Sequence, residues 1–68
     1  MDYVIYNKTN ETFLCLTNGK YLFSNNLDNA VSFWEDNAKY LIQEYKKLNP
    51  DQKDLIVIEK YKIHTNFH

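Results

Sequence analysis

The sequence predicts a small α+β domain, in which an antiparallel sheet of three to four strands has one main helix packed on one face. Runs of β-branched and aromatic residues occur in the first third of the chain and again near its end, which is typical of strands. One stretch between them repeats its apolar residues at the period of a helix. A length of 68 residues fits a single domain over 1–68. The expected order is β-β-β-α-β.

The first hairpin is expected close to the N-terminus. Tyr3–Tyr6 is rich in β-branched and aromatic residues and predicts the first strand. Thr12–Leu16 has the same character and predicts the second strand. The polar residues Asn7–Asn10 favour a turn between the two, and a four-residue loop over Lys8–Glu11 is the alternative.

The second hairpin has the strongest turn signal in the chain. Asn18 precedes Gly19, the single glycine, and this dipeptide favours a tight turn of two residues. Tyr21–Phe23 follows it and predicts a short third strand.

The helix is expected where apolar residues recur at steps of three and four, which gives one stripe along a helix. Glu35 and Asp36 suit the positive end of the helix dipole in its first turn. Lys46 and Lys47 suit the negative end in its last turn. The Asn49-Pro50 pair ends the helix, because proline cannot continue it. The stripe consists of Leu27, Ala30, Val31, Trp34, Ala38, Leu41, Ile42, Tyr45 and Leu48.

Two signals compete for the start of this helix. Ser32 followed by Glu35 is a capping-box pattern. It predicts a short turn over Asp28–Val31 and a main helix over Phe33–Leu48. The alternative is one long helix that begins near Leu27 and is capped by Asn26 or Asp28.

The last strand is expected over Asp54–Ile63. Its first half, Leu55–Ile58, is apolar on both faces. The residues after it alternate, which places Lys60 and Lys62 on one face and Tyr61 on the other.

Composition excludes several classes of protein. Eight lysines, no arginine and nine acidic residues give a net charge of −1, which excludes a strongly basic nucleic-acid clamp. Cys15 is the single cysteine, so a reduced thiol is expected and no internal disulfide. The apolar runs are too short to span a membrane, and the first residues lack the apolar core of a signal peptide. We therefore expect a cytoplasmic protein with no membrane contact.

No residue pattern indicates a catalytic centre, a metal site or a cofactor. Cys15 lies between two leucines in a strand, where a buried small side chain is expected rather than a nucleophile. His64 and His68 fall in the terminal tail, where a spacing of four has no meaning for a metal. Asp36 and Glu44 lie off the apolar stripe and are expected in solvent. We expect no enzymatic activity.

The strands hold more apolar residues than one helix can cover. Positions 3–6, 13–16 and 55–58 are apolar without a break, whereas a sheet with one wet face alternates apolar and polar residues. Contiguous exposed apolar surface marks sites of association, and tyrosine is enriched at their hot spots. We predict a partner-binding sheet face, which a one-residue register slip would invert. Its residues are Tyr3, Ile5, Tyr21 and Tyr61, with Tyr40 on the outer side of the helix as the alternative anchor.

Several segments resemble small accessory proteins encoded by phages and prophages of low-GC Gram-positive bacteria. They are Tyr3–Ile5, Lys20–Leu22 and Leu27–Phe33, followed by Ala38–Ile42 in the helix. The abundance of Asn, Lys, Tyr, Ile and Phe, and the scarcity of Ala, Arg, Gly and Pro, agree with an AT-rich genome.

This resemblance implies an anti-defence function, in which the protein binds one host protein and inhibits it by covering its surface. Nucleases of CRISPR and restriction systems are the targets that it implies, so an anti-CRISPR role is included. The chain lacks the strong negative charge of DNA mimics. Two alternatives stay open: a self-associating homodimer, and a weak nucleic-acid or nucleotide binder that uses Lys60 and Lys62.

Overall fold

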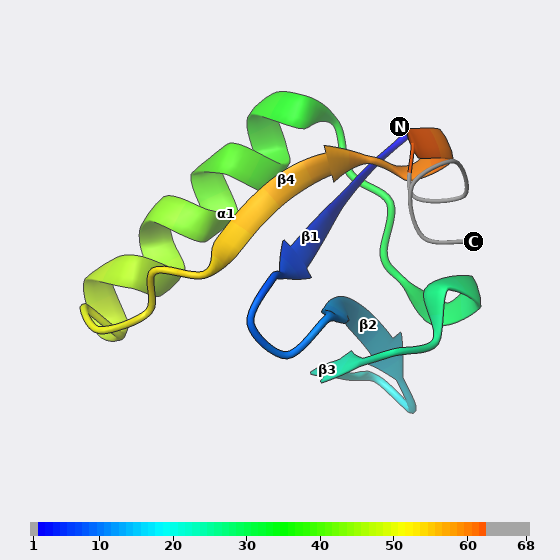
Figure 1. Ribbon diagram of the computed structural model, residues 1–68, viewed down its shortest axis with the longest axis horizontal. Coiled ribbons are helices and arrows are strands. Elements are labelled where there is room, and N and C mark those ends of the chain that lie inside the picture. The colour runs from blue at the N-terminus through cyan, green and yellow to red at the C-terminus, as the bar shows by residue number, and fades with distance from the viewer. Residues whose placement is uncertain (1, 63–68) are drawn as a thin grey trace.

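The computed structural model describes residues 2–62 (Figure 1). The strands form one antiparallel sheet in the order β3-β2-β1-β4, and the α-helix packs on one of its faces. The predicted α+β class is confirmed. His64 and His68 lie outside the described residues. The elements are β1 (Tyr3–Asn7), β2 (Thr12–Thr17), β3 (Lys20–Ser24), the 3-10 helix η1 (Leu27–Asn29), α1 (Glu35–Leu48) and β4 (Leu55–Glu59).

The loop between β1 and β2 covers residues 8–11, which was the four-residue alternative. Asn7 shapes this loop from its buried position. Its side-chain Oδ1 accepts hydrogen bonds from the backbone N–H groups of Thr9, at 3.0 Å, and Asn10, at 3.1 Å. An asparagine that bonds the backbone two and three residues ahead favours a turn over a continued strand.

The tight turn between β2 and β3 is confirmed. Asn18 has φ of 53° and Gly19 has φ of 76°, and positive values at both central residues define the type I′ turn. Thr17 pairs with Lys20 directly across it. Asn and Gly adopt this backbone more readily than other residues do, so the turn sets the register of the hairpin.

Replacing Gly19 with alanine is expected to cost about 1 kcal/mol of unfolding free energy, because a Cβ at positive φ is strained. No atom lies within 4 Å of that Cβ position, so a steric clash adds nothing. Urea denaturation followed by circular dichroism measures the loss. Gly19→Asn is the control and should lose less, since asparagine tolerates this region. Equal losses for both variants would contradict the assignment to backbone strain.

The helix begins at Glu35, two residues later than the capping-box pattern predicted. Trp34 is the N-cap residue and makes no capping hydrogen bond with its side chain. The predicted capping box at Ser32 is wrong, because the segment around it pairs with the sheet. Phe33 exchanges both backbone hydrogen bonds with Tyr3, at 2.8 Å and 3.2 Å. The short turn expected over Asp28–Val31 is present one residue earlier, as η1, with Asn26 as its cap.

The segment of residues 30–33 separates β2 from β1 at one end of the sheet. β1 and β2 pair only at Tyr6 with Phe13 and at Asn7 with Thr12. Further along, β2 bonds to this segment instead, where the N–H of Val31 donates to a β2 carbonyl at 3.0 Å. The β2–β3 hairpin therefore diverges from β1, β4 and α1, as Figure 1 shows.

Each face of the sheet has its own small core. Under α1 the buried residues are Ile5, Ala38, Ile42 and Leu55. On the opposite face Leu27 of η1 packs against a second buried cluster that includes Ala30. The connection between β3 and α1 thus covers the face opposite the helix. The predicted face assignment is therefore wrong, because Ile5 and Tyr21, which were predicted for the uncovered face, lie on the face on which α1 packs. The members of that second cluster are Val4, Tyr6, Phe13, Cys15 and Ala30.

β4 ends at Glu59, four residues before the predicted end of the strand. Glu59 pairs with Tyr3, the first residue of β1, and residues 60–62 turn into a short helical segment. The predicted alternation of Lys60, Tyr61 and Lys62 across a strand is therefore wrong. The N–H of Lys60 still donates to the carbonyl of Asp2, which closes the ladder.

Candidate functional site

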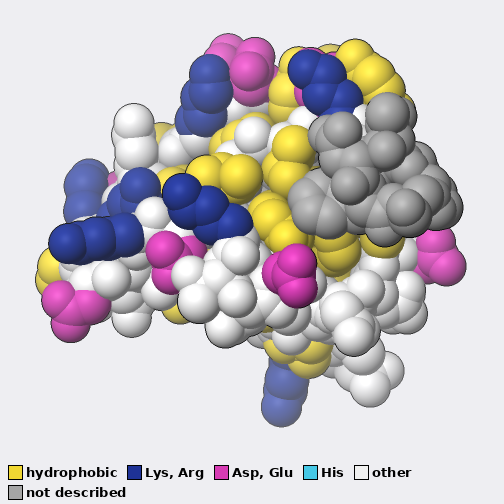
Figure 2. Space-filling model, viewed as in Figure 1, with side chains coloured by type: hydrophobic (Ala, Val, Ile, Leu, Met, Phe, Trp, Pro, Cys, Tyr) yellow, Lys and Arg dark blue, Asp and Glu magenta, His cyan; other side chains and the backbone are white. Residues whose placement is uncertain are grey.

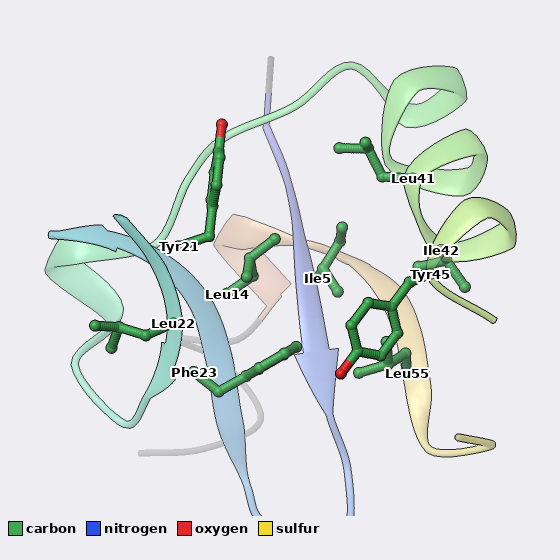
Figure 3. A pocket seen from close by; sticks show the side chains of 9 residues that line it. All are labelled: Ile5, Leu14, Tyr21, Leu22, Phe23, Leu41, Ile42, Tyr45 and Leu55. Carbon is green, nitrogen blue, oxygen red and sulfur yellow. The ribbon is translucent and has the colours of Figure 1, made fainter. Parts of the chain in front are cut away.

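An apolar groove separates α1 from the β2–β3 hairpin (Figure 3). Its volume is about 380 Å³. Ile5 and Leu14 come from the two strands that diverge, and side chains of the helix and of β3 face each other across them. The lining residues are Ile5, Leu14, Tyr21, Leu22, Phe23, Leu41, Ile42, Tyr45 and Leu55.

The groove exists because one helix covers half of this sheet. α1 packs on β1 and β4. Strands lie about 4.8 Å apart, so four of them span roughly 19 Å, whereas a helix with its side chains is about 10 Å wide. The helix-facing side of β2 and β3 is left without a helix above it. We call this surface, formed by Leu14, Leu16, Tyr21 and Phe23, the open half-sheet.

The side of α1 that faces the open half-sheet is also apolar. Leu41, Tyr45 and Leu48 succeed one another at steps of four and three, and all three are exposed. Leu41 and Tyr45 line the groove directly. Leu22 lines it near its backbone only, since its side chain points away to the opposite face (Figure 3). Because both walls carry exposed apolar side chains, the groove and its walls form one continuous apolar surface of the kind that marks sites of association.

The chemistry of the groove is that of a binding surface. None of its lining residues is charged, and the tyrosine hydroxyls of Tyr21 and Tyr45 are the polar side-chain groups among them. General acid–base catalysis needs titratable groups that converge, and the groove has no such pair. Within residues 2–62 no three His, Cys, Asp or Glu side chains gather as a metal site. The groove can therefore hold apolar or aromatic side chains of a partner.

The structure separates the residues predicted for the contact face. Tyr21 lines the groove and is 63% exposed. Ile5 is only 3% exposed because α1 packs over it, so its prediction as an exposed strand contact is wrong, and it forms part of the groove floor. Tyr3 and Tyr61 lie elsewhere, at the end of β4. Tyr40 is 60% exposed on α1 and is not a groove residue.

Tyr3 and Tyr61 meet in a charged corner around Glu59. A hydrogen bond from the Tyr61 hydroxyl lowers the pKa of Glu59 and raises the pKa of Tyr61. Burial, and then the charges of Glu35 and Glu59, raise the pKa of Tyr3. Lys62 Nζ lies 3.4 Å from a Glu59 carboxylate oxygen. These ionic contacts make the corner polar, in contrast to the groove.

The lysines form no basic track on the face that Figure 2 shows, where acidic side chains stand among them. Lys39, Lys47 and Lys62 each pair with a glutamate three or four residues earlier in the chain. Phosphate backbones are bound by clustered, unpaired cations. The arrangement therefore gives the nucleic-acid alternative little support.

Cys15 is buried, as predicted. Its Sγ lies 3.4 Å from the carbonyl oxygen of Phe13 and 3.5 Å from that of Asn26. Burial raises the pKa of the thiol, whereas a nucleophilic cysteine needs a lowered pKa. Cys15 therefore acts as a small core residue.

The sequence reasoning missed the helix side of the groove. Leu41, Tyr45 and Leu48 belong to the predicted apolar stripe, but they were not named among the predicted contact residues. The width of the apolar stripe was the signal that could have indicated this side of the groove, because a wide stripe is only partly covered by the sheet. Among the described residues of α1 only Ala38 and Ile42 are buried.

Comparison with protein-family models, with curated proteins and with solved structures found no match to this chain. No helix within residues 2–62 is long and apolar enough to cross a membrane.

Proposed function

We propose that this protein is a small non-enzymatic binding module that takes up an apolar segment of another protein in the groove between α1 and the β2–β3 hairpin. The observation that carries the proposal is the uncharged groove itself, with exposed Tyr21 and Leu41 on its two walls. Exposed aromatic and aliphatic side chains around a concave apolar site are typical of protein contacts.

The partner that we propose is a host protein in the cytoplasm of a low-GC Gram-positive bacterium, inhibited when this module covers its surface. The resemblance to phage and prophage accessory proteins supports this class, and a defence nuclease of the CRISPR or restriction type is the favoured target. The net charge of −1 favours surface occlusion over imitation of DNA.

Affinity capture from host lysate tests both the function and the site. Tyr21 and Tyr40 form a matched pair, because they are the same residue at 63% and 60% exposure. Wild-type protein and Tyr40→Lys are expected to retain the same host protein after nuclease treatment at moderate salt. Tyr21→Lys is expected to retain at least about tenfold less, because a charge is placed against a desolvated apolar surface.

Two results would contradict the proposal. Retention that survives Tyr21→Lys and is lost with Tyr40→Lys would move the contact to the outer side of the helix. Capture of no host protein by either the wild-type chain or Tyr40→Lys would remove the inhibitor function.

A further inference from the structure

We infer that, in the absence of another partner, a second copy of this chain covers the groove. The two copies form a two-fold dimer in which their open half-sheets stack face to face. The β3 edge of each copy then lies against the exposed apolar side of the other copy's α1. The dimer itself rests on the shape and chemistry of the groove alone.

The first argument is the fit of the surface to itself. The open half-sheet is two strands wide, about 10 Å, and a packed sheet lies about 10 Å above it, close to the height of α1. A copy turned over by a two-fold axis along the strands therefore meets the half-sheet at normal sheet spacing. Its β3 comes to rest beside Leu41, Tyr45 and Leu48. In an isologous contact the same surface of each copy must contain both complementary parts. Here those parts are the open half-sheet with its β3 edge and the exposed apolar side of α1.

The second argument is area. The exposed apolar residues on the helix-facing side of the groove and of the β2–β3 hairpin are Leu16, Tyr21, Leu41, Tyr45 and Leu48. Their uncovered surface amounts to roughly 550 Å² at about 200 Å² for a whole side chain. A standard interface buries about 800 Å² on each partner, and the flanking polar residues supply the remainder. The groove lining is uncharged, so two copies do not repel each other at their contact.

The third argument is the edge of the sheet. Residues that flank a two-residue turn exchange both of their backbone hydrogen bonds, which directs the N–H and C=O groups of Lys20, Leu22 and Ser24 toward β2. Tyr21 and Phe23 direct theirs to the outer side. Edge strands are usually protected by charged residues or proline. In β3 the one charged residue is Lys20, beside the turn, and the four residues after it include neither a charge nor a proline. Contact with a second α1 shields this edge.

Self-association would regulate the proposed function, and this consequence rests on that function. The dimer and the complex with another protein use the same groove, so each excludes the other. A partner must then outcompete the second copy, and the free protein keeps its apolar surface covered.

Sedimentation equilibrium of the purified protein tests the dimer without any partner present. Loadings from about 1 μM to about 1 mM cover the affinities of weak dimers. Wild-type protein and Tyr40→Lys are expected to show the same reversible monomer–dimer equilibrium. Tyr21→Lys and Leu41→Lys are expected to raise the dissociation constant by at least about a hundredfold, since each dimer contains the change twice. Circular dichroism shows whether each of these two variants is folded. If one of them fails to fold, the other variant provides the test of the dimer.

A wild-type chain that stays monomeric at the highest loading would overturn the inference, as would a dimer that Tyr40→Lys weakens as much as Tyr21→Lys. A monomeric wild type that still captures a host protein would refute the dimer and leave the proposed function standing. A wild-type chain that dimerises but captures no host protein would refute the proposed function and leave the dimer standing.

Discussion

Replacing Val4 with aspartate is expected to leave the protein largely unfolded at 25 °C. Val4 is completely buried in β1, a central strand of the sheet. A carboxylate there loses its hydration and gains no ion pair, which costs several kcal/mol, roughly 4 or more. A chain of 68 residues has an unfolding free energy of only about 3–10 kcal/mol. Far-ultraviolet circular dichroism and a urea titration measure the outcome.

Leu16→Asp is the matched control for this experiment. Leu16 also lies in a strand but is half exposed, so its carboxylate stays hydrated and the fold is expected to survive. A cooperative transition for Val4→Asp at the urea concentration of the wild type would show that the core around β1 is not assembled as described.

Native Cys15 is expected to react with iodoacetamide at least about a hundredfold more slowly than the same residue in the urea-unfolded chain, because reagent access requires opening of the core. Burial raises the thiol pKa, so the reactive thiolate is also scarcer in the folded state. For the same reason, the contribution of this thiol to stability is complete below its ordinary pKa and declines as the pH rises above it. Mass spectrometry of quenched samples gives both rates.

The urea dependence of this reaction distinguishes its mechanisms. If opening is global, the labelling rate rises with urea as the unfolding free energy falls, and Gly19→Ala accelerates it because this change also lowers the unfolding free energy. Rapid labelling in buffer alone, with no effect of Gly19→Ala, would mean that Cys15 is reached by a local movement of β2 and is not held in a cooperative core.

Local signals predicted most of the fold. The type I′ turn at Asn18-Gly19 depends on two residues and a backbone preference, and it was located to the residue. The helix end and the charges of its terminal turns depend equally on neighbouring residues. The helix start was misplaced because Phe33 pairs with Tyr3, thirty positions away in the chain. A local capping pattern contains no information about such a pairing.

The site was harder to predict for a related reason. The surplus of apolar residues in the strands is visible in the sequence, and Tyr21, one of the predicted contact residues, lines the groove. Whether Ile5 or Leu41 is exposed depends on where the helix axis crosses the sheet. The residues next to them in the sequence do not determine that position. Side-chain period assigns residues to a face of a strand or helix, but it does not say which part of the face is covered.

The pairing of β1 with β4 also has a consequence for the newly made chain. β1 is synthesised first, yet the strand that completes one of its edges, Leu55–Glu59, is synthesised after the helix. Pairing between distant segments is slow, because the loop must close before the contacts form. A nascent chain that has not yet reached β4 exposes the apolar side of α1 and leaves one edge of β1 unpaired. A premature stop before Leu55 is therefore expected to yield a substrate for chaperones and proteases, and not a shortened working protein.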